Sequence, residues 1–145
     1  MAISTRTGSC LCGSVKVSIQ GMPVYTNLCH CTSCQKFSGA IFGSLVAFKT
    51  SEVSFSESEP SIMKTYEDTS PESGRIVKRL FCGRCGSSLC GIRSGFEDIS
   101  ILAIGIIDGD KSDLQPQFEF FQKSKVDWIA PVAGSQCFNT LPSAS

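Results

Sequence analysis

The stretch Cys29-His30-Cys31-Thr32-Ser33-Cys34 places three thiols within six residues of chain. Three cysteines this close together are poorly placed for independent disulfides, whereas the C-x-C-x-x-C spacing lets their sulfurs turn toward one ion. Zinc is the metal we expect, because it binds thiolates in a tetrahedral arrangement. A structural zinc site has four protein ligands, and a catalytic site has three with one position open. The function therefore depends on whether a fourth ligand reaches this cluster.

Two cysteine pairs flank the cluster, Cys10-Leu11-Cys12-Gly13 and Cys82-Gly83-Arg84-Cys85-Gly86. The second is typical of a zinc knuckle, because a tight C-x-x-C turn followed by glycine presents two thiolates on one side. The first alone is weak evidence, since alternate residues of any strand share a face. Together the pairs supply four ligands, whereas adding either pair to the triplet gives five. We therefore expect one closed site and one open site. The closed site is made by Cys10, Cys12, Cys82 and Cys85. The open site is made by Cys29, Cys31 and Cys34.

The two remaining cysteines are Cys90 and Cys137. A free cysteine usually behaves as a small buried apolar residue, and we expect that role for both. Cys137 could instead reach the open position of the triplet and close it. The total of nine is odd, and seven lie in tight clusters, which favours reduced, metal-bound thiolates over a disulfide framework.

Length and charge limit the remaining alternatives. The chain has 145 residues and 41% hydrophobic content, so we expect one domain over residues 1–145 with its core at about 8–130. Thirteen basic and thirteen acidic side chains cancel, so no general field favours nucleic acid or an anionic membrane. The first six residues lack the apolar run of a signal peptide, and no segment approaches the ~20 apolar residues that span a bilayer. We expect a cytoplasmic protein that binds neither membrane nor nucleic acid.

The hydrophobic pattern predicts a mainly β fold of antiparallel strands with at most short helical turns. Val15, Val17 and Ile19 alternate with polar residues, which indicates a half-buried strand over 14–20. One helical turn is expected to begin at Thr32, which would act as its cap. The segment from Val126 to Ile129 is expected to pack on the core. Residues 139–145 are expected to form a frayed tail. The further predicted strands are 24–28, 41–48, 53–55, 61–66, 75–81, 88–92, 99–107 and 118–121.

Taken together, these motifs resemble the glutathione-dependent formaldehyde-activating enzyme family, which also includes centromere protein V-like proteins. The resemblance covers residues 8–130 and includes all three cysteine clusters in order, with Gln35-Lys36 after the triplet and Trp128 near the end. It implies a β-tent fold with a structural zinc at the closed site and a catalytic zinc at the open site. It also implies formation and cleavage of the carbon–sulfur bond that joins glutathione to formaldehyde.

We therefore expect a zinc-dependent carbon–sulfur lyase or synthase that acts on thiol–aldehyde adducts, as in S-(hydroxymethyl)glutathione synthesis. Two zinc ions are expected, a small-molecule thiol and an aldehyde are the expected partners, and glutathione is a candidate co-substrate. Two alternatives stay open at this point. One is a zinc-dependent lyase, isomerase or cyclase that acts on a specialised metabolite without glutathione. The other is a non-catalytic, zinc-stabilised protein-binding module in which the triplet is also closed.

Residues that bind substrate are harder to find from sequence. His30, the one histidine, lies between two expected ligands and is a weak candidate for a proton shuttle. Lys36 is a weak candidate for binding a carboxylate of glutathione. Other basic residues near the clusters could do the same, although each alone is typical of a solvated strand face: Arg75, Lys78, Arg79 and Arg84.

Overall fold

The computed structural model describes residues 4–142, which form eleven strands and one short α-helix together with four 3-10 turns. The helix is α1 (Thr32–Ser38). The strands are β1 (Thr5–Ser9), β2 (Val15–Gln20), β3 (Tyr25–Cys29), β4 (Gly43–Lys49), β5 (Val53–Glu57), β6 (Met63–Asp68), β7 (Val77–Cys82), β8 (Ser88–Arg93), β9 (Ile99–Ala103), β10 (Phe118–Phe120) and β11 (Gln136–Cys137).

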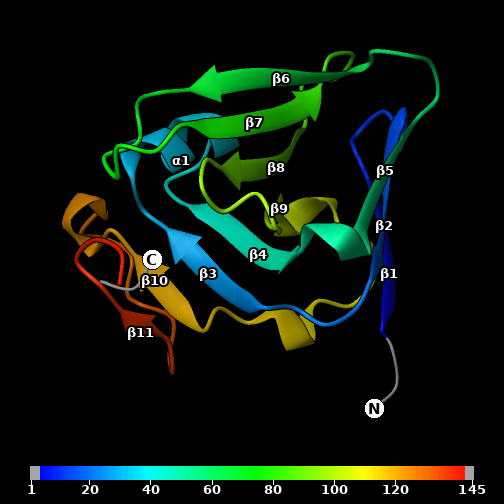
Figure 1. Ribbon diagram of the computed structural model, residues 1–145. Helices are drawn as coiled ribbons and strands as arrows, with labels where there is room; N and C mark the ends of the chain where they lie inside the picture. Colours follow the sequence, from blue (N-terminus) through cyan, green and yellow to red (C-terminus); the bar gives the residue numbers. More distant parts are fainter. Residues whose placement is uncertain (1–3, 143–145) are drawn as a thin grey trace.

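The strands form two sheets that meet at an angle (Figure 1). The smaller sheet has the order β1-β2-β5 and is antiparallel throughout. The larger has the order β11-β10-β3-β4-β9-β8-β7-β6. Its strands from β3 to β6 are antiparallel, whereas β10 runs parallel to both β3 and β11. The fold is therefore mainly β, as predicted, but the parallel strands at one edge were not expected.

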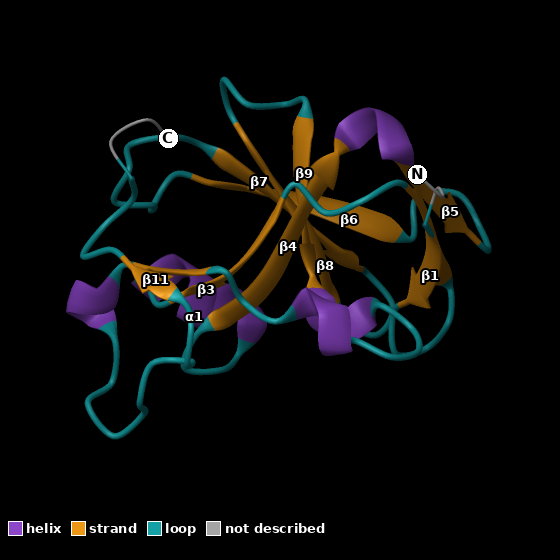
Figure 2. Ribbon diagram, turned by 90° about the horizontal axis from the view of Figure 1, so that it is seen from below, coloured by secondary structure: helices purple, strands orange, loops and turns teal. Residues whose placement is uncertain are grey.

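The main core contains residues of both sheets, and Figure 2 shows the smaller sheet with β1 and β5 at one side of the larger one. Val15, Val17 and Ile19 of β2 are buried, as their alternation predicts, and they belong to one cluster with Val46 and Phe48 of β4. Burying an aliphatic side chain of this kind contributes roughly 1.5–3 kcal/mol. A slip of one residue in the pairing of β2 would turn this set toward solvent, so the core also determines the register.

A second, smaller cluster lies where β10 meets β3. Phe118 and Phe120 of β10 stack with their ring centroids 5.7 Å apart, and the Tyr25 ring approaches each of them edge-on at 6.3 Å. Phe138 and Leu141 pack on the same cluster from the chain's final segment. The expectation of a frayed tail is therefore wrong for Leu141, whereas residues 143–145 and the first three lie outside the described part.

Several elements differ from the expectations. β1 was not predicted, because Thr5-Arg6-Thr7-Gly8-Ser9 is polar and lacks alternation. It pairs with β2 and makes one further antiparallel bridge, from Gly8 to Ile107. The strand expected over 99–107 ends at Ala103 and continues as a 3-10 turn over Ile104–Ile106. Trp128 is 68% exposed, so the prediction that its segment packs on the core is wrong. None of the helices within residues 4–142 has the length and apolar character needed to cross a bilayer.

Candidate metal centres and the adjoining cavity

The two cysteine pairs meet at one end of the molecule, as the ligand count predicts. Cys10 and Cys12 lie in the turn between β1 and β2, while Cys82 ends β7 and Cys85 lies in the turn before β8. The four sulfurs lie within 4.8 Å of one another. The Sγ atoms of Cys10 and Cys12 are 3.6 Å apart, and those of Cys12 and Cys82 are 3.8 Å apart. A tetrahedral zinc with bonds of ~2.3 Å requires sulfurs about 3.8 Å apart, so this group fits the ion.

Backbone N–H groups turn toward this four-sulfur group. The amides of Arg84 and Cys85 both donate to the Cys82 Sγ at 3.4 Å, and the turn closes at Gly86, whose φ is +78°. Glycine adopts this left-handed conformation without the steric strain that a side chain adds. The pKa of Cys85 is lowered to about 5, mainly by a hydrogen bond from the Ser87 hydroxyl. The turn thus favours thiolates, which are the form that binds a metal.

The triplet forms a second sulfur group, well separated along the chain. Cys29 ends β3, Cys31 caps α1 and Cys34 lies in the first turn of that helix, and their sulfurs also lie within 4.8 Å of one another. The Cys31 Sγ accepts a hydrogen bond from the Cys34 N–H at 3.3 Å, so the cap is Cys31 and not Thr32 as predicted. The predicted helical turn is confirmed, with a sulfur in place of a hydroxyl at its start.

No fourth ligand joins this triplet within the part of the chain that the structure describes. Cys137 is exposed on β11, so the expectation that it is buried is wrong, and it stands outside the group. Cys90 is buried in β8, and its burial raises the pKa of its thiol to about 12, which keeps it neutral. The three-sulfur group therefore has the ligand number of an open metal site.

The three thiols of the triplet act as one ionisable unit. Hydrogen bonds from Cys29 and Cys34 are the main cause that lowers the pKa of Cys31. The pKa of Cys29 is raised by the hydrogen bonds of Cys29 to Cys31 and Cys34, together with burial. The Arg79 guanidinium charge favours the thiolate form of Cys31 and of Cys34, although the hydrogen bond to Cys31 and burial raise the pKa of Cys34 overall to about 11. A divalent cation would replace the shared protons, so the donor chemistry fits zinc.

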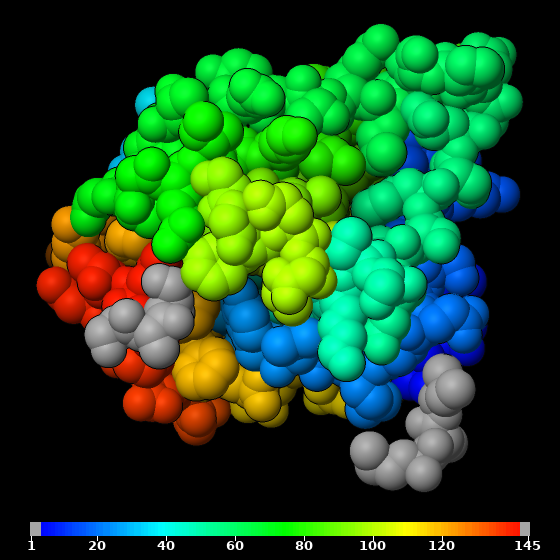
Figure 3. Space-filling view, in the orientation of Figure 1, coloured from blue at the N-terminus to red at the C-terminus, as the bar shows by residue number. Residues whose placement is uncertain are grey.

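A cavity of about 120 Å³ adjoins the triplet. It lies against one face of the larger sheet, where β3, β4, β7, β8 and β9 each contribute residues. Small residues create this space: Gly43, Gly91 and Ala103 stand among the lining residues, and a Cβ on Gly43 would lie 3.3 Å from the Cβ of Cys34. The rim is formed by residues 71–73 and Leu141, from segments whose surfaces lie close together in Figure 3.

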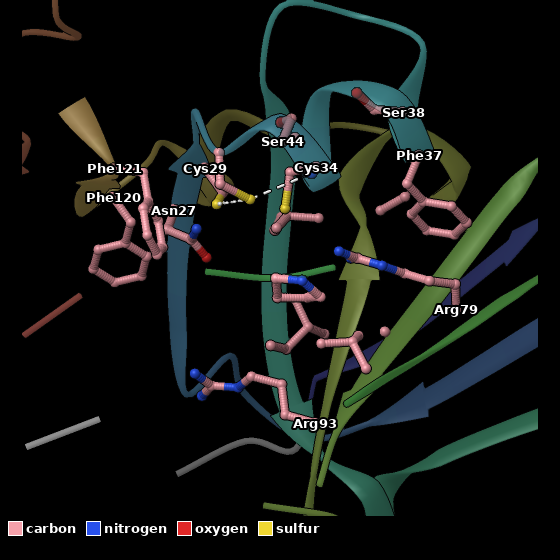
Figure 4. Close-up of a pocket in the computed structure, with 18 of the residues that line it drawn as sticks. Asn27, Cys29, Cys34, Phe37, Ser38, Ser44, Arg79, Arg93, Phe120 and Phe121 are labelled. Carbon is pink, nitrogen blue, oxygen red and sulfur yellow. Dashed lines mark hydrogen bonds between the residues drawn. The ribbon is translucent and has the colours of Figure 1, made fainter. Parts of the chain in front are cut away.

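Three polar side chains extend into the cavity from separate strands. Asn27 of β3 lies beside Cys29, the guanidinium of Arg79 of β7 points toward the space next to Cys34, and Arg93 of β8 lies at the opposite end of the cavity (Figure 4). The Arg79 Nε donates to the Asp68 Oδ2 at 3.1 Å. Its terminal nitrogens make no hydrogen bond to any described residue. Burial would raise the pKa of Asp68, but hydrogen bonds from Ser70 and Arg79 outweigh it and lower that pKa.

The two weak candidates for substrate binding lie away from this cavity. His30 is fully buried, and its ring meets the Phe42 ring edge-on with the centroids 5.7 Å apart. Lys36 is exposed on α1 and borders a separate surface hollow next to Ser33 and Tyr66. Neither residue is among those that line the cavity, and their roles in binding remain predictions.

Glu119 anchors His30 and was missed by the sequence reasoning. Only 1% of Glu119 is exposed, and its carboxylate accepts hydrogen bonds from the His30 Nε2 at 2.8 Å and the Val132 N–H at 2.7 Å. Ser135 and Gln122 donate to it at 2.9 and 3.3 Å. Burial would raise the pKa of this carboxyl, but the hydrogen bonds outweigh it and lower the pKa. A single glutamate in an aromatic strand carries no sequence signal for such a role.

Comparison with known proteins places these features in context. A family model described as glutathione-dependent formaldehyde-activating enzyme matches residues 5–124. A crystal structure of a Rhodobacter sphaeroides protein is similar in fold, with a TM-score of 0.54 and 18% sequence identity over 74% of this chain and 92% of that one. No protein of curated function matches the chain at a significant level. At this identity the structural likeness concerns the fold alone.

Proposed function

This chain belongs to the glutathione-dependent formaldehyde-activating enzyme family, and from that membership we propose that it is a zinc-dependent carbon–sulfur lyase and synthase. Its substrates are thiol–aldehyde adducts of the S-(hydroxymethyl)glutathione type, and the three-sulfur group beside a cavity is the observation that carries the proposal. Cys10, Cys12, Cys82 and Cys85 hold a structural zinc ion. Cys29, Cys31 and Cys34 hold the zinc ion at which substrate binds.

The donor set suits this chemistry. Cys29, Cys31 and Cys34 would hold the zinc ion, which would supply Lewis acidity that favours the thiolate form of a substrate thiol. Three thiolates and the divalent ion leave a net charge of about −1, which is poorly suited to generating hydroxide from water and well suited to accepting a neutral thiol. The cavity lining is largely apolar, with Leu45, Phe120 and Phe121 close to the sulfurs, and it keeps bulk water from the adduct.

Arg79 stabilises the oxygen of the aldehyde during the reaction. In the forward direction the thiol sulfur bonds to the carbonyl carbon, the carbonyl π bond breaks, and the proton lost by sulfur ends on oxygen. The terminal N–H groups of Arg79 make no hydrogen bond to the described residues and extend into the cavity that the sulfurs border, where a reacting oxygen would lie (Figure 4). Fixed donors aimed at a developing negative charge are among the largest contributions to catalysis. Asp68 positions Arg79 through its Nε and leaves both terminal groups for substrate.

Exchange spectroscopy tests this proposal. The zinc-loaded protein should speed the exchange between free glutathione and S-(hydroxymethyl)glutathione, measured by NMR at equilibrium with formaldehyde. A Cys31→Ser variant should lose this effect, and a Cys137→Ser variant should retain it because Cys137 stands apart from both sulfur groups. If the zinc-loaded protein leaves the exchange rate unchanged for glutathione and for smaller thiols with several aldehydes, the chain is not an enzyme of this type.

A further inference from the structure

We propose that the cavity selects a compact substrate that carries a carboxylate, bound by Arg93 at the end away from the triplet (Figure 4). The identity of the reacting group, a thiol or its aldehyde adduct, rests on the function proposed above. The carboxylate site rests on different observations, namely the charge balance, the unpartnered Nε of Arg93 and the size of the cavity. None of these depends on a metal.

The charges around the cavity leave Arg93 without a counter-ion. Arg79 pairs with Asp68, and Glu72 on the rim pairs with Lys123. Arg93 takes part in no ion pair within residues 4–142, and its guanidinium carbon lies 4.9 Å from the centroid of the Phe96 ring. The sulfurs of the triplet lie at one end of the cavity and Arg93 at the other, so the cavity has a sulfur end and a cationic end (Figure 4).

One polar group in this wall lacks a hydrogen-bond partner. The Arg93 Nε is buried and has no acceptor among the described residues. A buried polar group left unpaired is costly, and most such groups in proteins find a partner. A carboxylate has two acceptor oxygens, and the planar guanidinium can donate to both. One anionic group would therefore satisfy Arg93.

The size of the cavity limits the rest of the substrate. Its volume of about 120 Å³ is well below the ~300–1,000 Å³ that is usual for sites that bind drug-sized ligands. The sulfur and the carboxylate of the substrate should therefore be joined by a short chain of a few carbons. A tripeptide such as glutathione would leave much of its length beyond the rim.

Paired thiols of equal length test the carboxylate site. 3-Mercaptopropionate and cysteamine differ at the far end, where one carries a carboxylate and the other an ammonium group. Binding of each to the zinc-loaded protein is measured by isothermal titration calorimetry. We expect a preference for 3-mercaptopropionate that falls about tenfold or more in Arg93→Gln, since charge-assisted hydrogen bonds are roughly twice as strong as neutral ones. Comparing variants cancels the different acidities of the two thiols.

Arg75→Gln is the matched control. The Arg75 guanidinium carbon lies 4.5 Å from the centroid of the same Phe96 ring, but Arg75 is not among the residues that line the cavity. It should therefore keep the wild-type preference. Zinc content and circular dichroism verify that both variants fold. An equal fall in the two variants, or no preference in the wild type, would overturn the carboxylate site.

A second readout separates this inference from the proposed function. In ¹H–¹⁵N spectra, propionate, which has no thiol, should shift the Arg93 Nε–H signal and leave that of Arg75 in place. Adduct exchange without a carboxylate preference or a propionate shift would refute the inference and leave the function standing. A carboxylate preference and a propionate shift without adduct exchange would refute the function and leave the inference standing.

Discussion

Replacing Glu119 with alanine should destabilise the protein more than any other single carboxylate deletion we consider. The change removes a carboxylate that is 1% exposed and leaves the donors of His30, Val132 and Ser135 without their acceptor. A hydrogen bond to a charged group contributes roughly 1.5–3 kcal/mol, and such losses are not additive when they share one partner. We expect a loss of about 4 kcal/mol for Glu119→Ala. Glu119→Gln should lose about half as much, because an amide keeps the volume and one acceptor.

Thermal unfolding at a fixed excess of zinc measures this effect. For a chain of this length 1 kcal/mol corresponds to roughly 2–4 °C, so Glu119→Ala should unfold about 10 °C below the wild type. The control is Glu97→Ala, since Glu97 is exposed and accepts one backbone hydrogen bond from Gly95. It should shift the midpoint by less than about 2 °C. If Glu119→Ala and Glu97→Ala unfold within about 2 °C of each other, the anchoring role of Glu119 is wrong.

Three further predictions concern the metal sites, acid stability and the free thiols. Cys82→Ser should reduce the zinc content from two ions to one and lower the midpoint temperature of unfolding, because the closed site joins the two sheets. Two zinc ions retained in this variant, measured by atomic absorption, would contradict this. The pKa of Asp68 is lowered in the folded state, so its stabilisation is complete above about pH 4 and disappears as the pH falls through the folded pKa. Asp68→Asn should therefore be less stable than the wild type at pH 7 in urea, and the difference in unfolding free energy should close as the pH falls through the lowered pKa of folded Asp68. A difference that stays constant with pH would speak against the ion pair with Arg79. Iodoacetamide at pH 8 should modify exposed Cys137 well before Cys90, which is buried with its pKa raised to about 12; equal rates by mass spectrometry would be inconsistent with this packing.

Most strands could be predicted because their pattern is local. The alternation of Val15, Val17 and Ile19 depends on the face that each side chain occupies, and the structure places all three in the core. The pairing of β10 with β3 could not be predicted in the same way. It joins Phe118 to Asn27 across ninety-one positions of sequence, and neither strand carries a signal for a parallel partner.

The candidate site shows the same division. The two sulfur groups could be predicted, because ligand spacing within each motif is local and four-plus-three is the division that leaves no stranded thiolate. The cavity could not, since it depends on the register that brings Asn27, Arg79 and Arg93 to one face of the sheet. Arg79 was one of several basic residues near the clusters, while Arg93 and Asn27 had no distinguishing pattern around them. Their placement follows from long-range pairing, which single-sequence periodicity does not contain.

The most direct test is a crystal structure of the zinc-loaded protein with anomalous data at the zinc edge. The account predicts two zinc ions, one bound by Cys10, Cys12, Cys82 and Cys85, and one bound by Cys29, Cys31 and Cys34 with a small molecule as its fourth ligand. A side chain of the protein in that fourth position, or no zinc at the triplet under metal-replete conditions, would contradict it.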